Sequence, residues 1–269
     1  MAMKITFIGG GIMGEALMAG LLRAKLAAPA DIAVSEPVEA RRKRLADTLR
    51  IRAEATADAI VSGADLVVLA IKPQNLADVM PGLGKLLTKG QTVASIIAGA
   101  RIDTLSKGLG TNAVIRIMPN TPAQIGAGMT VWTATPTVPA AALDAAKKML
   151  GTLGVELRVD DEKLIDMSTA LSASGPAYVF LFIEALIDAG VYMGMTRDMA
   201  RTLALQTVLG SAQMVKETGQ HPAQLRDMVT SPGGTTAEAL RAFENAGFRR
   251  AVIDAVVAAY EKSKRLGNS

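Results

Sequence analysis

Short β-rich segments alternate with helical segments through the first half of the chain, and this alternation restricts the possible folds more than any other feature. The expected buried strands are short, rich in Val and Ile, and bounded by Gly, Pro or charged residues. They are Lys4–Ile8, Ile32–Ser35, Leu66–Ile71, Thr92–Ile97 and Ala113–Met118, with further candidates at Gly128–Thr133 and Val155–Val159. Helical segments such as Glu15–Lys25 and Val38–Leu49 lie between them. This order predicts a parallel, doubly wound α/β sheet.

The pattern changes near Asp160, because the rest of the chain shows long helical segments and no convincing strand. We therefore expect a doubly wound domain over residues 1–160 and an all-α domain over residues 161–269. In the second domain, Tyr178–Ile183 is apolar nearly all round, whereas a surface helix has a single apolar stripe. A domain of about a hundred residues cannot easily bury such a helix alone, so we expect it at an interface between subunits. A central helix buried within one monomer is the alternative.

Composition argues against several functional classes. The chain has no cysteine, so disulfides and thiol chemistry are absent and a redox role requires a bound cofactor. The single histidine, His221, precedes Pro222 as a surface turn residue does, and neither a Ser-His-Asp set nor a metal-ligand spacing occurs. We therefore expect neither a metal site nor a hydrolytic site.

Charge and hydropathy limit the expected partners. A net charge of +4 suits anionic small molecules, and aromatic residues, at 3% of the chain, are too few for a nucleic-acid surface. No secretion signal precedes the first apolar strand. The most apolar stretch, Ala177–Ile187, contains Glu184 and is too short to cross a bilayer. We expect a protein of the cytoplasm, or of another reducing soluble compartment, with neither a membrane nor a nucleic-acid partner.

The first strand runs into a Gly-x-Gly-x-x-Gly turn formed by Gly9, Gly11 and Gly14. Gly9 allows the tight turn, Gly11 lets the backbone approach a pyrophosphate, and Gly14 lets the next helix pack closely on the strand. The N-terminus of that helix adds free N–H groups and a positive dipole end. The turn therefore predicts a dinucleotide site. Its expected cofactor-binding residues are Gly9, Gly10, Gly11, Ile12, Met13 and Gly14.

The end of the second strand gives opposing indications of the cofactor. An acid at this place commonly binds the ribose hydroxyls of NAD, so Glu36 indicates NAD. Ser35 and the basic run Arg41–Arg44 indicate the phosphate of NADP. For most of that run, a solvated helix face is the preferred interpretation. The cofactor preference stays open between NADP and NAD.

Ligands of doubly wound sheets bind beyond the carboxyl ends of the strands. Ala70, Lys72 and Pro73 follow one such strand, and Pro73 ends the ladder because it has no N–H to donate. Lys72 is expected to reach toward the cofactor phosphates or ribose; a plain lysine at a strand end is the alternative. Ala98 and Asn120 follow the next two strands and are expected to border the nicotinamide. Asn120 is the one polar side chain there, although it can also serve only the turn beside proline.

Thr230–Glu238 is a Gly-rich loop that opens a helix. Gly233 and Gly234 allow successive N–H groups to point in one direction, which suits a carboxylate. The hydroxyls of Thr235 and Thr236 can meet a ring nitrogen. Plain helix capping by either threonine is an equally good interpretation of the residues alone.

Several motifs together resemble pyrroline-5-carboxylate reductases. In the second half these are Ser172–Tyr178, His221–Leu225 and Ser231–Thr236, and in the first half Lys72–Pro73 and Met118–Pro122, so the likeness spans almost the whole chain. The resemblance implies a Rossmann domain followed by a helical dimerisation domain. It implies a homodimer with interleaved C-terminal helices, or an assembly of such dimers, with active sites between subunits. It also implies hydride transfer from NAD(P)H to the C=N carbon of 1-pyrroline-5-carboxylate, which gives proline.

The resemblance assigns roles to the late loop. By the family's pattern, the amides of Thr235 and Thr236 bind the substrate carboxylate and the Thr236 hydroxyl faces the ring nitrogen, which makes Thr236 the catalytic candidate. Gly233 and Gly234 belong to the same substrate site. Glu162 matches a position that contacts the ligand in relatives, whereas Ser35, Lys72 and the Gly9–Gly14 turn match cofactor positions.

Departures and rival functions remain. Glu36 stands where many relatives have a neutral or basic residue, which puts the usual NADP preference in doubt, and Ala57 and Met228 replace asparagines of some relatives. A 3-hydroxyacid dehydrogenase of similar fold uses a lysine on the interdomain helix, and residues 164–215 contain none. A catalytically silent NAD(P)-binding regulator is the second rival, but the substrate loop that such a protein would lack is intact.

Overall fold

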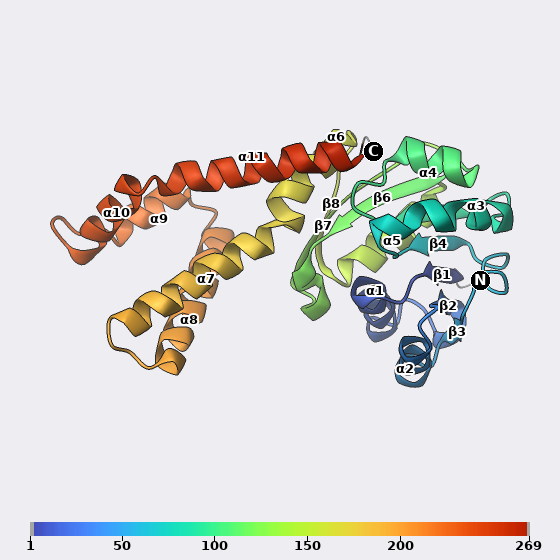
Figure 1. Cartoon of the computed structure of the whole chain (residues 1–269), viewed down its shortest axis with the longest axis horizontal. Helices are drawn as coiled ribbons and strands as arrows, with labels where there is room; N and C mark the ends of the chain where they lie inside the picture. The colour runs from blue at the N-terminus through green and yellow to red at the C-terminus, as the bar shows by residue number, and fades with distance from the viewer. Residues whose placement is uncertain (1–2, 268–269) are drawn as a thin grey trace. The chain divides into compact units, whose positions relative to one another are not determined.

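The computed structural model describes residues 3–267 (Figure 1). Within them the chain forms two compact units. One runs to Ser174 and also includes the segment from Ala259 onward, and the other is Gly175–Ala258. This division lies later than the expected boundary at residues 160 and 161, because the helical segment that begins at Lys163 packs on the sheet.

The described residues form one eight-stranded sheet in the order β3-β2-β1-β4-β5-β6-β7-β8. Strands β1 to β6 are parallel to one another, β7 is antiparallel to β6, and β8 is parallel to β7. The strand order reverses between β1 and β4, which is where doubly wound folds bind their ligands. The bounds are β1 Ile5–Ile8, β2 Ile32–Ser35, β3 Arg52–Glu54, β4 Leu66–Leu69, β5 Thr92–Ser95, β6 Val114–Pro119, β7 Gly128–Ala134 and β8 Gly154–Arg158.

Helices cover both faces of this sheet. Helices α1 (Ile12–Arg23), α2 (Glu39–Leu49) and α5 (Ala140–Gly151) contribute to one hydrophobic cluster, and α3 (Leu76–Leu86) and α4 (Ile102–Leu109) contribute to the other. Every residue of β1, β4, β5 and β6 is buried, as expected for parallel strands with helices on both sides. Short 3₁₀ turns are η1 (Pro29–Asp31), η2 (Pro73–Asn75) and η3 (Thr121–Ile125). The predicted fold class is confirmed.

The strand assignments differ from the sequence-based expectation in two respects. The edge strand β3 was not expected, since its residues Arg52 and Glu54 are charged and no apolar run marks it. Strands β4 and β5 end at Leu69 and Ser95, two residues earlier than expected, because the chain there leaves the sheet to form loops. Pro73 accordingly begins η2 and does not end the strand ladder.

A continuous helical segment leads out of the sheet domain. It consists of α6 (Lys163–Ser168), the π-helical turn η4 (Thr169–Ala173) and α7 (Gly175–Tyr192). The hydroxyls of Ser168 and Thr169 both donate to the Ile165 carbonyl, at 2.9 and 2.8 Å, and such bonds compete with the regular helical ladder. A π-helical turn just before Pro176 thus joins α6 to α7 within one helical segment.

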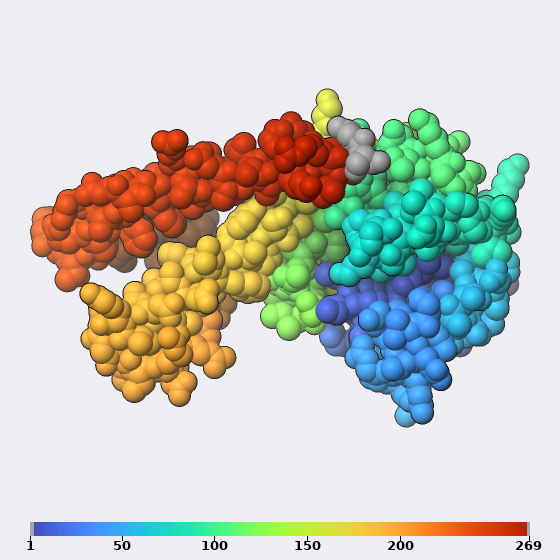
Figure 2. Space-filling view, in the orientation of Figure 1, coloured from blue at the N-terminus to red at the C-terminus, as the bar shows by residue number. Residues whose placement is uncertain are grey.

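The second unit contains α7, α8 (Arg197–Thr218), α9 (Pro222–Met228), α10 (Thr235–Asn245) and the first part of α11 (Phe248–Gly267). Within the described chain, the buried residues of α7 are Gly175 and Gly190, while Phe180 and Leu181 are 61% and 67% exposed. Figure 2 shows the surface of α7, in yellow, open to solvent. Burial of this helix within one monomer, the alternative considered above, is therefore wrong.

The apolar segment is also longer than the sequence suggested. The helix Lys163–Tyr192 spans 30 residues and, by length and composition alone, is able to cross a membrane. A helix that packs against a partner subunit can have the same length and composition. The exposed apolar side chains of α7 therefore need either a lipid bilayer or a partner subunit to cover them.

Candidate active site

The glycine turn has the steric features that a bound pyrophosphate requires. Gly9 has φ +101°, and a Cβ there would lie 2.7 Å from the Ala70 carbonyl oxygen. A Cβ at Gly14 would lie 2.7 Å from the Gly9 carbonyl oxygen, so the start of α1 packs directly on the turn. By contrast, no described atom lies within 4 Å of a Cβ built at Gly11. The space beside Gly11 is therefore open to a ligand at the N-terminus of α1, and the residues fit a dinucleotide.

Glu36 holds this turn in place. Its side chain is 3% exposed; Oε2 accepts from the Gly10 amide at 3.0 Å and from Arg41 at 3.2 Å, and Oε1 accepts from the Val38 amide at 2.9 Å. The carboxylate thus connects the glycine turn to the start of α2, with Arg41 offsetting its charge. The sequence suggested only a ribose contact for Glu36, and this bracing role was missed.

Other residues of the basic run also have partners in the domain. Arg42 donates to the Glu36 carbonyl at 2.9 Å, and Arg44 pairs with Glu15 of α1. Ser35 is buried at the end of β2, and its carbonyl accepts from the Gly9 amide at 2.8 Å. Arg41 and Arg44 are 44% and 56% exposed, so they are both paired and solvated.

The loops after β4 and β5 lie at the carboxyl edge of the sheet. Lys72 is exposed at the start of η2 and has no ion-pair partner among residues 3–267. Ala98 lies in the loop that joins β5 to α4 and is half-buried. Both positions are compatible with the cofactor contacts expected of them.

Asn120 joins the end of β6 to the π-helical turn. Its Oδ1 accepts from the Met129 amide at 2.9 Å, and its Nδ2 donates to the Ser172 carbonyl at 3.3 Å. Both ends of the amide are thus engaged within the domain, so Asn120 fixes local structure whatever it contacts in a ligand.

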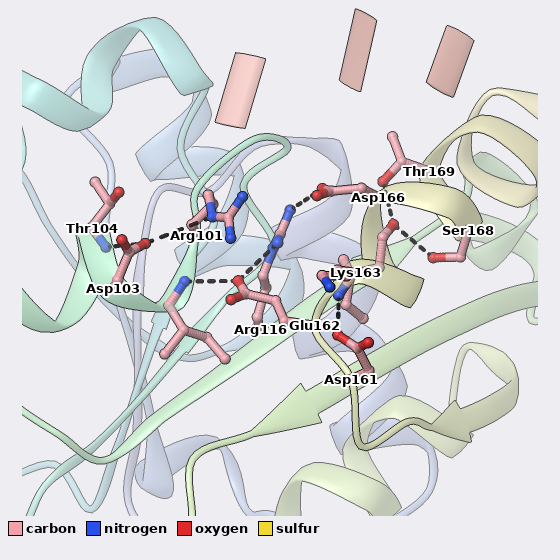
Figure 3. Close-up of polar contacts among 12 residues, drawn as sticks. Arg101, Asp103, Thr104, Arg116, Asp161, Glu162, Lys163, Asp166, Ser168 and Thr169 are labelled. Carbon is pink, nitrogen blue, oxygen red and sulfur yellow. Dashed lines mark hydrogen bonds and ion pairs between the residues drawn. The ribbon is translucent and has the colours of Figure 1, made fainter. Parts of the chain in front are cut away.

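A buried ion cluster lies next to the carboxyl edge of the sheet. Figure 3 shows Arg116 of β6 pointing between two acids of the α6 region, Glu162 and Asp166. Arg116 is fully buried; Nη1 donates to Glu162 Oε1 at 2.8 Å and Nη2 to Asp166 Oδ1 at 2.7 Å. Glu162 Oε1 also accepts from the Ile102 amide, at 2.8 Å, at the start of α4. Arg116 was not predicted as a site residue, although a charge inside an apolar strand requires buried partners and was a usable signal.

The late glycine loop belongs to the second unit. Gly233 has φ +66° and Gly234 is the N-cap of α10, with no side-chain capping bond. Capping by Thr235 or Thr236 is therefore wrong, because both residues lie inside the helix. The first helical bond runs from the Glu238 amide to Gly234, so the helix itself offers no acceptor to the amides of residues 235–237.

His221 is the N-cap of α9, where its Nδ1 accepts from the Ala223 amide at 3.2 Å. The expectation of a turn residue is confirmed, and the ring acts within its own helix start.

The chain is similar to known enzymes over its whole length. The family described as pyrroline-5-carboxylate reductase dimerisation matches residues 162–266, and the family described as NADP oxidoreductase, coenzyme F420-dependent, matches residues 4–99. A pyrroline-5-carboxylate reductase of Synechocystis sp. is 45% identical over 267 residues, covering 99% of both chains.

Solved structures agree. A pyrroline-5-carboxylate reductase from Coxiella burnetii superposes with a TM-score of 0.91 at 35% identity, covering 100% of both chains. The pyrroline carboxylate reductase of Plasmodium falciparum, solved with NADP bound, gives a TM-score of 0.89 at 34% identity over 98% of both chains. The match to the dimerisation family contains the exposed apolar helix α7, which supports the formation of an oligomer.

Proposed function

The chain belongs to the pyrroline-5-carboxylate reductase family, and from this membership we propose that it reduces 1-pyrroline-5-carboxylate to proline with NAD(P)H, the last step of proline biosynthesis. The observation that carries the proposal is 45% identity to such a reductase over 99% of both chains. The open, braced glycine turn supplies the independent structural support.

The cofactor residues are those of the first unit. The amides at the start of α1, around Gly11 and Met13, bind the pyrophosphate. Lys72 and Ser35 serve the phosphate and ribose groups, while Ala98 and Asn120 border the nicotinamide. When bound, the reduced nicotinamide supplies the hydride. NADPH is the proposed donor, with NADH as the alternative.

The substrate residues are those of the late loop and Glu162. Gly233 and Gly234 shape the loop so that the amides of Thr235 and Thr236 bind the substrate carboxylate. The Thr236 hydroxyl forms a hydrogen bond with the ring nitrogen. Because the carbon of a protonated imine is already a good hydride acceptor, correct placement contributes most of the rate enhancement.

The working enzyme is a homodimer or an assembly of homodimers. The exposed side chains of α7 and of α11, including Phe180, Leu181 and Ile253, are covered by the partner's helices. This arrangement covers the apolar helix that by length and composition could enter a membrane, and the proposed location is the cytoplasm, without a nucleic-acid partner.

Absorbance of the reduced nicotinamide provides the test. Purified protein is mixed with NADPH and 1-pyrroline-5-carboxylate, and the absorbance should fall as proline forms; NADH is compared in parallel. Turnover of 3-hydroxyacids with oxidised cofactor, but not of the imine, would indicate the dehydrogenase alternative. Cofactor binding without turnover of either substrate would indicate a silent regulator.

A further inference from the structure

We propose that Arg116 is a positioning residue for the reduction, because it fixes Glu162 and thereby the loop between β5 and α4 that borders the nicotinamide. This inference rests on the proposed function. It also reassigns Glu162, whose carboxylate fixes that loop in addition to any contact it makes with the substrate.

The first support is a shared atom. Glu162 Oε1 accepts from Arg116 Nη1 at 2.8 Å and from the Ile102 amide at 2.8 Å, so the guanidinium fixes the same oxygen that fixes the end of the loop. Arg116 also binds Asp166 at 2.7 Å, which orients α6 on the same strand. The loop end, α6 and β6 are therefore tied together at one buried group.

The second support is charge. Arg116 has no exposed surface, while the side chains of Asp166 and Glu162 are 8% and 23% exposed. One cation faces two carboxylates, and the excess negative charge lies where Glu162 meets the N-terminus of α4, which favours an anion. Within the described part of the chain the guanidinium donates to these two acids alone, and its buried Nε has no acceptor.

The third support comes from the other side of the loop. Gly99 has φ +77°, and a Cβ there would lie 3.2 Å from the Cβ and carbonyl oxygen of Leu266. A Cβ at Gly267 would lie 3.4 Å from the Cδ of Arg101. The loop is thus contacted by Glu162 and Leu266, which stand at the beginning and the end of the segment matched by the dimerisation family.

The location of the loop gives this arrangement a role in the reaction. In a doubly wound sheet, the adenosine half of a dinucleotide lies toward β2, so the nicotinamide half lies toward β4 and β5. A shift of the loop after β5 should therefore misplace the nicotinamide and leave the adenosine half unaffected. Since Arg116 has no exposed surface, any effect of its substitution on the cofactor passes through its partners.

The test compares two ligands in full-length variants. NADPH and 2′-phospho-ADP-ribose, which lacks the nicotinamide, are titrated calorimetrically into the wild-type protein, Arg116→Lys, Arg116→Met and Glu162→Gln. Glu156→Gln is the matched control, because Glu156 accepts from Trp132 Nε1 at 2.6 Å in the same sheet and its other partner among residues 3–267, Lys147, also lies outside the loop.

Arg116→Met should weaken NADPH binding about tenfold or more and lower kcat, with the fragment's affinity changed less than about twofold. Arg116→Lys and Glu162→Gln should show smaller effects of the same kind. A lysine still offers a cation to the two acids, and a glutamine still offers a side-chain oxygen to the Ile102 amide. Glu156→Gln should lower Tm alone. If Arg116→Met does not fold, the two milder variants decide.

Equal losses for NADPH and the fragment, or a fall in Tm without any change in NADPH affinity and kcat, would overturn the proposal. A wild-type protein that fails to turn over the imine would contradict the proposed function instead, and the comparison of the two ligands would still decide whether Arg116 positions the loop.

Discussion

Asn120 donates to the carbonyl of Ser172 at 3.3 Å, and the residue four positions after Ser172 is Pro176. Proline has no N–H, so the regular helical donor to this carbonyl is missing. A side chain from the end of β6 takes its place. Pro176 of the Ser172–Tyr178 motif and Asn120 of the first half are thus linked through one carbonyl group, although they lie 56 positions apart in sequence.

Asn120→Ala should destabilise the protein by about 1–3 kcal/mol, because it removes two hydrogen bonds and leaves the Met129 amide without an acceptor. Urea unfolding measures the change. Gln124→Ala is the control, since its bond to the Thr121 carbonyl is exposed and its loss should cost less than about 0.5 kcal/mol. Equal destabilisation by the two substitutions would contradict this account of Asn120.

Gly11→Ala and Gly9→Ala should separate cofactor binding from folding. An added Cβ at Gly11 meets no described atom, so Tm should stay near the wild-type value while NADPH affinity falls about tenfold or more. At Gly9 the positive φ and the Ala70 carbonyl oppose a side chain, so stability should fall by about 1–3 kcal/mol. Thermal unfolding and calorimetric titration check both. Full NADPH affinity in Gly11→Ala would show that the pyrophosphate lies elsewhere.

The two glycines also show what the sequence could reveal. Periodicity and spacing predicted the sheet, the helical second half and the need for glycine at positions 9 and 14, because these depend on local backbone requirements. The bond between Glu36 and the Gly10 amide and the two ion pairs of Arg116 could not be predicted, since they join residues 26 positions apart and 46 or more positions apart, respectively. Strand β3 was missed because an edge strand of charged residues carries no apolar pattern.

Arg41→Ala should shift the cofactor preference toward NADH. Arg41 offsets the Glu36 carboxylate at 3.2 Å, so its removal leaves a negative charge near the end of β2, where the ribose phosphate of NADP is expected. The ratio of kcat/KM for NADPH to that for NADH should fall about tenfold. Arg44 is exposed to a similar extent as Arg41 and pairs with Glu15. Arg44→Ala, which breaks that ion pair, should leave the ratio unchanged. An unchanged ratio in Arg41→Ala would place the phosphate away from this arginine.

Leu181→Asp should dissociate the assembly. Leu181 is 67% exposed in the single chain, and an exposed site in a monomer tolerates such a change within about 0.5 kcal/mol. At a dimer interface, the buried carboxylate instead opposes association. Sedimentation velocity should show smaller species, whereas Lys148→Asp, at a 59% exposed side chain of α5 in the sheet domain, serves as the control. Retention of the wild-type mass by Leu181→Asp would place α7 outside the interface.

Thr236→Ala should lower kcat about 10- to 100-fold while NADPH affinity stays within about twofold, because the hydroxyl is expected to meet the substrate ring and not the cofactor. The residue is the second of α10 and its hydroxyl caps nothing, so Tm should change little. Thr202→Ala, which removes an exposed hydroxyl bonded to the Asp198 carbonyl at 2.9 Å, is the matched control and should keep full activity. Steady-state kinetics and calorimetric titration of the same samples provide both readouts. A collapse of cofactor affinity in Thr236→Ala would mean that this threonine belongs to the dinucleotide site, and unchanged kcat would remove it from the reaction.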